Sequence, residues 1–170
     1  MDVGLLQSLS YVAAAIGVCK AAVYYVMNLR YQNRTRQAQL FMQVHARWGD
    51  RAFIKGFYDI LNIWEWKDFD DWGSKYGQRA NEEAFLTICE IVWYFDGVGL
   101  LVKEGLIDIG LVEAIYSDRV IKLWEKGYTL TMGLRELNRN PDYYGNFEYL
   151  YREMKKRQVK PSTPATLDGS

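Results

Sequence analysis

The residues that most often build metal, redox and catalytic centres are scarce in this sequence. Its 170 residues include one histidine, His45, and two cysteines, Cys19 and Cys89. The cysteines lie too far apart for a disulfide framework or a zinc motif. A ferritin-type di-iron bundle needs two Glu-x-x-His motifs, and Met42 stands where the Glu before His45 would be. We therefore expect no metal and no cofactor.

Acidic residues are absent between Asp2 and Asp50. Residues 1–50 carry five basic and two acidic side chains, a net charge of +3, and the remainder carries −3 because the whole chain is neutral. A mildly acidic domain beside a basic segment does not have the charge pattern of a nucleic-acid-binding protein. We expect no nucleic-acid partner.

Strand patterns are also missing. No segment alternates polar and apolar residues in the manner of a strand, and no hairpin signal is present. Gly97-Val98-Gly99 falls within a helical pattern and lacks the rest of a phosphate-binding motif. Apolar residues recur at helical spacing throughout, so the sequence predicts an all-α fold.

The densest group of possible metal ligands is acidic and lies between two tryptophans. It comprises Glu65, Asp68, Asp70 and Asp71. In a calcium loop that began at Asp68, Trp72 and Arg79 would stand at ligand positions. A solvated acidic face or a helix cap is the better interpretation.

Asp96 is the one carboxylate that we expect to be partly buried, because it lies on the flank of an apolar helical stripe. A structural ion pair with a Lys or Arg is the preferred interpretation of this position. The sequence contains no group to which we assign catalysis, and we expect that the protein is not an enzyme.

An apolar run of membrane length opens the chain. Between Val3 and Leu29 the only charged side chain is Lys20, which can extend its ammonium towards the headgroups. Tyr24 and Tyr25 stand where interfacial aromatic residues are expected. About 20 apolar residues are enough to span the hydrocarbon core, so the pattern predicts a transmembrane helix.

The charges around this run predict its orientation. Arg30, Arg34 and Arg36 follow it within seven residues, and no basic side chain precedes it. The positive-inside rule then places the amino terminus outside and the bulk of the chain in the cytoplasm. A cleaved signal peptide would carry its basic residues before the apolar run. A buried core helix and an oligomerising or interfacial helix remain alternatives.

Small side chains within the run could let two such helices pack closely. Ala14, Gly17 and Ala21 lie on one helical face. We expect a homo-oligomer or a subunit of a membrane protein complex, although a face that contacts only lipid would look the same.

Four regions follow from the composition. We predict a membrane anchor over residues 1–29, a basic helical stalk over 30–37, a helical bundle over 38–157 and a disordered tail over 158–170. In the bundle, Asp50, Asn81 and Asp108 are predicted helix caps, and Gly97 and Gly99 are expected to allow close helix packing. We also expect a helix break near Ser117 and a last helix that begins at Pro141.

Aromatic residues make up 15% of the chain, including six Trp and thirteen Tyr. A small helical core filled by large side chains is the favoured explanation, and a partner-binding surface is the alternative.

Several blocks together resemble an uncharacterised prokaryotic family of single-pass membrane-anchored helical proteins. The blocks are Ala22–Arg30, Arg36–Gln43, Tyr94–Phe95, Gly99–Val102, Gly105–Asp108, Trp124–Glu125 and Phe147–Leu150. The resemblance spans about residues 10–156 and implies an amino-terminal anchor followed by a helical cytoplasmic domain. It implies no catalytic residues.

These observations lead to one functional expectation and one alternative. We expect a membrane-tethered helical interaction protein, such as a scaffold, accessory subunit or regulator, that associates through its anchor helix and an aromatic-rich domain. The alternative is a ligand-binding sensory domain that signals through a continuous anchor–stalk helix, with an enclosed pocket lined by Trp and Tyr beside that helix.

Overall fold

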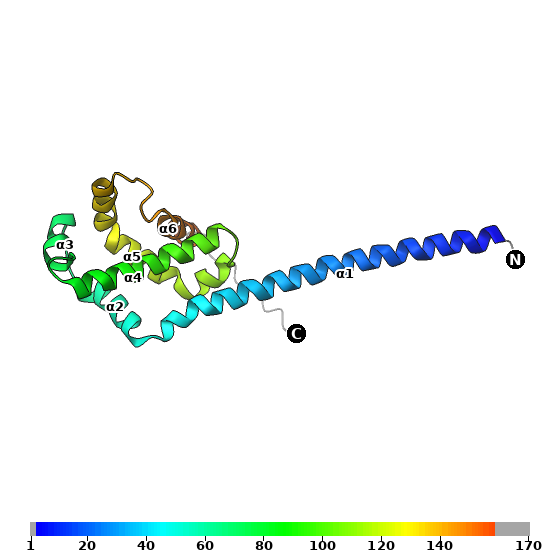
Figure 1. Ribbon diagram of the computed structural model, residues 1–170, viewed down its shortest axis with the longest axis horizontal. Helices are drawn as coiled ribbons and strands as arrows, with labels where there is room; N and C mark the ends of the chain where they lie inside the picture. Colours follow the sequence, from blue (N-terminus) through cyan, green and yellow to red (C-terminus); the bar gives the residue numbers. More distant parts are fainter. Residues whose placement is uncertain (1–2, 159–170) are drawn as a thin grey trace, which may run out of the picture. The chain divides into compact units, whose positions relative to one another are not determined.

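A computed structural model describes residues 3–158, with the side chains of residues 3–4 and 11–158. Helices make up most of this part of the chain, which contains no strand. The predicted all-α fold, with a long apolar helix followed by a helical bundle, is confirmed (Figure 1). The helices are α1 (Val3–His45), the 3₁₀ helix η1 (Ala46–Gly49), α2 (Arg51–Asn62), α3 (Phe69–Tyr76), α4 (Glu82–Lys103), α5 (Ile109–Asn138) and α6 (Gly145–Gln158).

The chain divides into two compact units, Met1–Gln39 and Leu40–Ser170. The described part of the first unit is α1 alone. The second unit begins with the last turns of α1 and contains every other helix. Most of the tail expected over residues 158–170 lies outside the described residues, and Gln158 itself is the last residue of α6.

The predicted caps begin three of the helices. The side chains of Asp50, Asn81 and Asp108 each accept a hydrogen bond from a backbone N–H in the first turn of α2, α4 and α5. Such caps satisfy amide groups that have no partner within the helix. These short local patterns are enough to determine where these three helices start.

Two other predicted boundaries are wrong. The expected break near Ser117 is absent, because Tyr116 and Val120 belong to one buried stripe and α5 continues through them to Asn138. The last helix begins at Gly145 and not at Pro141. Tyr144 has a φ of 57°, a left-handed conformation that a helix excludes, so α6 can start only after it.

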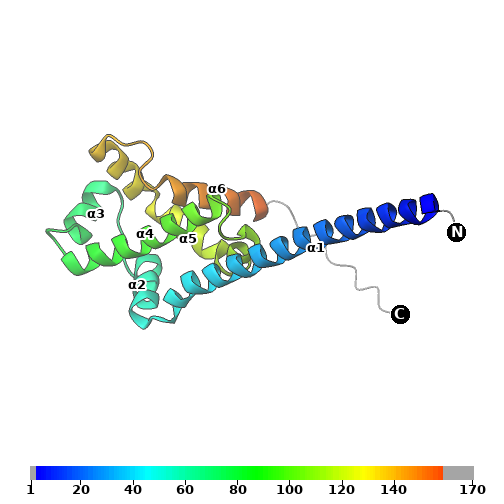
Figure 2. The same cartoon turned by 45° about the vertical axis from the view of Figure 1, so that its right-hand side comes forward.

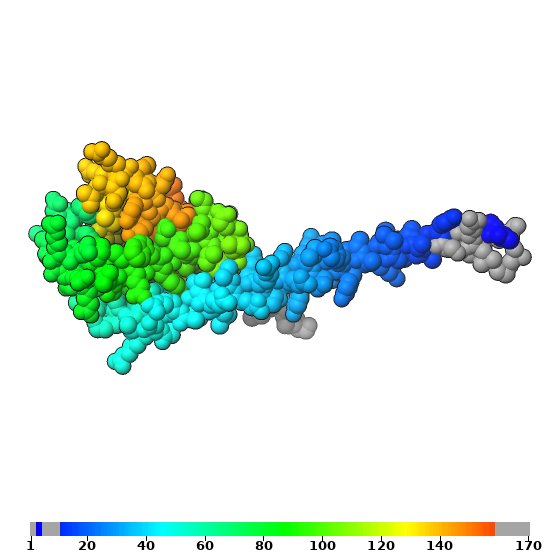
Figure 3. All heavy atoms as spheres, in the orientation of Figure 1, coloured from blue at the N-terminus to red at the C-terminus, as the bar shows by residue number. Residues whose placement is uncertain are grey.

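Helix α4 supplies the centre of the bundle core. Ile91 and Phe95 are completely buried, and α4 packs against α2, α3 and α6. Figure 2 shows α6 beside α4 and α5. Part of α4 also reaches the surface, where it is seen in green on the face of the bundle in Figure 3. The favoured explanation of the aromatic content holds here, since Phe95 contacts several rings, including Phe57, Tyr116 and Phe147.

Asp96 joins α4 to the start of α6. Its carboxylate accepts a hydrogen bond of 2.9 Å from the backbone N–H of Phe147 and one of 3.3 Å from the Asn146 amide. The side chain is half-buried, as expected, but no Lys or Arg among the described residues pairs with it. The expected ion pair is therefore wrong. The free N–H groups and positive dipole at the start of α6 take the place of a basic side chain.

One turn further along α4, Gly99 permits close contact with the same backbone. A Cβ atom at position 99 would lie 2.1 Å from the carbonyl oxygen of Asn146. The close approach predicted for Gly99 is thus confirmed. Gly97 does not share this role, because a Cβ there meets nothing within 4 Å.

The connection between α5 and α6 is held by charge. Arg135 donates from Nε to the carbonyl oxygen of Tyr143 at 3.0 Å and from its guanidinium to Glu148 at 2.7 Å. Burial acts to raise the pKa of Glu148, but the hydrogen bonds and charges of Arg135 and Arg152 outweigh it and hold that pKa below its ordinary value. The carboxylate therefore stays ionised and keeps the connection in place at neutral pH.

Gly99→Ala should destabilise the bundle, whereas Gly97→Ala should not. The added methyl group at position 99 meets backbone that cannot move freely, so we expect a loss of about 1–3 kcal/mol. At position 97 the same change replaces a glycine by a better helix former, so it should stabilise the bundle by up to about 1 kcal/mol. Thermal unfolding of the two variants, followed by circular dichroism, measures the difference. Equal midpoints would contradict the role assigned to Gly99.

Candidate functional site

Two helices are long and apolar enough to span a membrane. The first lies within Tyr11–Gly49, with a mean hydropathy of 1.6 over its most apolar window and none of that window buried. The second is α4, which has a mean hydropathy of 1.7 over such a window, with 44% of that window buried. Core helices and signal sequences meet the same criteria. Because α4 supplies the bundle core, we treat only α1 as a candidate span.

The predicted interface residues all lie on α1 with exposed side chains. They are Lys20, Tyr24, Tyr25, Arg30, Arg34 and Arg36. None of the four basic groups forms an ion pair with another described residue. Their charges are therefore left to solvent or to groups outside the described chain.

The small residues on α1 also form an open face. Ala14, Gly17 and Ala21 are exposed, and a Cβ added to Gly17 meets nothing within 4 Å. Their spacing of three and four residues keeps them on one side of the helix.

The last turns of α1 belong to the bundle core. Phe41 is only 5% exposed and stacks on His45, with 5.9 Å between ring centroids. The Nδ1 atom of His45 lies 2.5 Å from the hydroxyl oxygen of Tyr116 on α5. Burial raises the pKa of Tyr116, which is 1% exposed and remains a neutral phenol. The sole histidine therefore has a structural partner, which sequence analysis did not identify.

Further hydrogen bonds extend this contact to α4 and η1. The hydroxyl of Tyr94 accepts from the Trp48 indole at 3.1 Å. Its own proton can reach the carbonyl oxygen of Val44 at 3.3 Å or the hydroxyl of Tyr116 at 3.5 Å. We call His45, Trp48, Tyr94 and Tyr116 the α1 joint. It connects the end of α1 to two core helices through side chains that are half-buried or, for Tyr116, buried.

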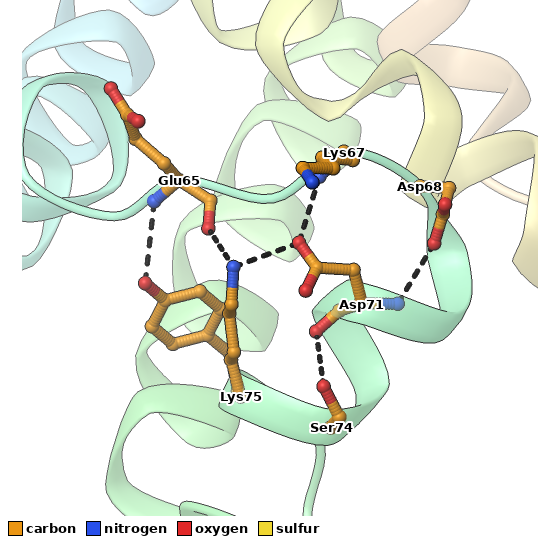
Figure 4. A network of polar contacts seen from close by, with 7 residues as sticks. Glu65, Lys67, Asp68, Asp71, Ser74 and Lys75 are labelled. Atoms are coloured by element: carbon orange, nitrogen blue, oxygen red, sulfur yellow. Dashed lines mark hydrogen bonds and ion pairs between the residues drawn. The ribbon is translucent and has the colours of Figure 1, made fainter.

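The acidic segment before α3 acts as a helix cap, as expected (Figure 4). The Asp68 side chain accepts from the backbone N–H of Asp71 at 2.8 Å. The Asp71 carboxylate accepts from the Lys67 backbone N–H at 3.0 Å and from Lys75 Nζ at 2.8 Å. Lys75 in turn donates to the carbonyl oxygen of Glu65.

This arrangement also explains the charge state of the cap. The hydrogen bond from Lys75, followed by that from the Lys67 backbone, lowers the pKa of Asp71. The carboxylates of Asp68 and Asp71 thus stabilise the start of α3. The described residues contain no group of three His, Cys, Asp or Glu side chains that could hold a metal ion.

An apolar cavity of about 160 Å³ lies inside the bundle. Four tryptophans and two tyrosines contribute to its lining: Trp66, Trp72, Trp93, Trp124, Tyr143 and Tyr144. The sensory alternative predicts an aromatic pocket beside the anchor helix. No residue of α1 lines this cavity. A separate open groove is lined in part by Val44, near the end of α1. Trp93 lines both the cavity and the groove.

The fold and these sites define a class of protein, an all-α bundle preceded by an exposed apolar helix. The chain belongs to the family described as Domain of unknown function (DUF4760), which matches residues 11–154. The resemblance to an uncharacterised family is thereby confirmed. No curated protein and no solved structure matches the chain.

Tyr116→Phe should loosen the α1 joint while keeping the buried ring. The change leaves His45 Nδ1 and the Tyr94 hydroxyl with one partner fewer, at an expected cost of about 1–3 kcal/mol. The control is Tyr128→Phe, on the same helix but 52% exposed, which should shift stability by less than about 0.5 kcal/mol. Thermal unfolding measures the stability of the two variants. The rate of amide hydrogen exchange at residues 40–45 should rise only in Tyr116→Phe.

Proposed function

We propose that this protein is a membrane-tethered helical interaction protein. In this proposal α1 spans the membrane with the amino terminus outside, and the bundle lies in the cytoplasm. The observation that supports it best is the contrast within α1. Its residues 11–29 are mainly apolar, with Lys20 as the one charged side chain, and all of them are exposed, whereas Phe41 and His45 near its end pack into the bundle.

Energetics favour a membrane or a partner around the first part of α1. Val12, Ile16, Val18 and Val23 each expose half or more of their surface. Apolar surface left in water costs about 25 cal/mol per Å², so a row of such residues is unfavourable unless lipid or protein covers it. Arg30, Arg34 and Arg36 then favour the orientation with the bundle inside.

The bundle offers a second apolar surface on α4. Leu86, Trp93 and Leu100 are 55%, 60% and 44% exposed, and their spacing of seven residues places them on one helical face. Beside them runs the open groove that Val44 helps to line. Exposed large apolar residues on one face are typical of protein interaction surfaces, with Trp as a frequent anchor.

A sensory role is the second candidate, and one observation favours it. Trp93 lines both the apolar cavity and the groove beside Val44 in the last turn of α1. A molecule in the cavity would therefore touch a side chain that also borders the end of the anchor helix. Binding could change the position of α1 only if the two arrangements of Trp93 differ in affinity for that molecule.

The topology can be tested by cysteine labelling in intact cells. In a Cys19→Ala background, Val3→Cys should react with a membrane-impermeant maleimide, whereas Leu137→Cys, on an exposed position of α5, should react only after lysis. The background itself retains only buried Cys89 and sets the baseline. The reverse pattern would refute the orientation, and release of the protein by alkaline carbonate would refute the span.

Self-association through α1 can be tested by enlarging its small-residue face. Gly17→Leu should separate packed helices, because two backbones can approach closely only at small residues. Val23→Leu, on the opposite side of α1, is the matched control. The mass of the detergent-solubilised protein should correspond to a dimer or larger for wild type and Val23→Leu, and fall towards a monomer for Gly17→Leu. A monomeric wild type would exclude self-association.

A further inference from the structure

The cavity inside the bundle has the size and lining of a small-molecule site. Its volume is about 160 Å³, and its walls come from α2 to α6 and from the connection before α6. An apolar cavity of about 150 Å³ in another protein stays dry and binds benzene. The cavity is thus large enough for one aromatic ring with a short substituent.

The lining determines the charge that such a molecule can carry. None of the lining residues is a Lys, Arg, Asp or Glu. Burial raises the pKa of Cys89, so that its side chain is a neutral thiol at physiological pH. A charged ligand would lose its hydration without gaining a counter-charge, which is strongly unfavourable. The site therefore selects neutral molecules.

One residue of the lining carries a polar group that has no partner. Trp72 is 5% exposed, and its indole Nε1 is buried without a hydrogen-bond acceptor in the described part of the chain. A buried donor that remains unpaired is unfavourable by about 1–3 kcal/mol. The cap of α3 holds this tryptophan in position, because Asp68 and Asp71 order the turn that leads into it. An acceptor beside the indole edge would remove that penalty.

We propose that the cavity binds a neutral aromatic molecule that carries one hydrogen-bond acceptor, such as a ketone oxygen, and that this acceptor pairs with Nε1 of Trp72. The ring packs among the apolar side chains of α4 and α5, including Val92 and Leu130. This inference concerns the bundle alone and holds whether or not α1 spans a membrane.

Three probes of similar size separate the components of the proposal. Acetophenone has the ring and the acceptor, ethylbenzene has the ring without an acceptor, and benzoate carries a charge. Each is titrated into the full-length protein in detergent while the methyl NMR signals of Ile60 and Ile88, which line the cavity, are followed. Ile16 on the exposed part of α1 reports partition into the micelle. Acetophenone should bind most tightly, ethylbenzene more weakly, and benzoate at least about 100-fold more weakly than acetophenone.

Two variants test the site directly. Trp72→Phe keeps a ring but removes the N–H, so the affinity for acetophenone should fall about five- to tenfold, and that for ethylbenzene should stay the same. Gly127 lines the cavity, and a Cβ there meets no atom within 4 Å. Gly127→Leu should therefore fill the cavity, so that neither acetophenone nor ethylbenzene shifts the methyl signals of Ile60 and Ile88. The control is Gly97→Leu, which adds the same side chain outside the cavity.

The proposal fails if neither neutral probe shifts the methyl signals of Ile60 and Ile88 by more than it shifts the methyl signal of Ile16. It also fails if benzoate binds as well as acetophenone, or if Gly127→Leu binds the probes like wild type. Equal weakening of acetophenone and ethylbenzene by Trp72→Phe would refute the hydrogen bond. If Gly127→Leu does not fold, the comparison of the two neutral probes in Trp72→Phe still decides the outcome.

Discussion

The close contact between α4 and α6 is the constraint on which the bundle depends. Gly99 lets the backbone at Asn146 approach α4, and Asp96 one turn earlier receives the N–H of Phe147. These two interactions place Phe147 against Phe95, with 5.6 Å between ring centroids, and against Trp124 on α5 at 5.1 Å. Three helices are thereby brought together at one point, and the aromatic core and the cavity follow from that arrangement.

The α1 joint performs a different task, because it gives a long apolar helix a defined end. Phe41 supplies buried apolar surface, and His45 and Tyr116 supply a polar contact that needs a particular geometry. Apolar packing alone tolerates small rotations of a helix, whereas a partly buried hydrogen bond favours one register. The joint therefore fixes how the last turn of α1, within the second unit, packs on the core.

Local patterns were sufficient for much of the fold. The caps Asp50, Asn81 and Asp108, and the apolar stripe of α4, depend on residues a few positions apart, and each was predictable from sequence. Predictions that depended on distant neighbours were less successful. Ser117 resembles a helix start, yet the buried stripe through Tyr116 and Val120 continues α5 past it. The partner of Asp96 lies 51 residues away and is a backbone group, which no pairing of charges could suggest.

The sequence by itself determined an all-α chain with an apolar first helix, a basic segment after it and a mildly acidic remainder. Helical periodicity, caps and the order of charges are local properties, so they can be read without knowledge of the fold. Only the tertiary structure decided that His45 meets Tyr116, that Gly99 and not Gly97 permits close packing, and that Trp72 lines a neutral cavity. These features arise from contacts between segments far apart in the chain, and their geometry exists only when the helices have packed.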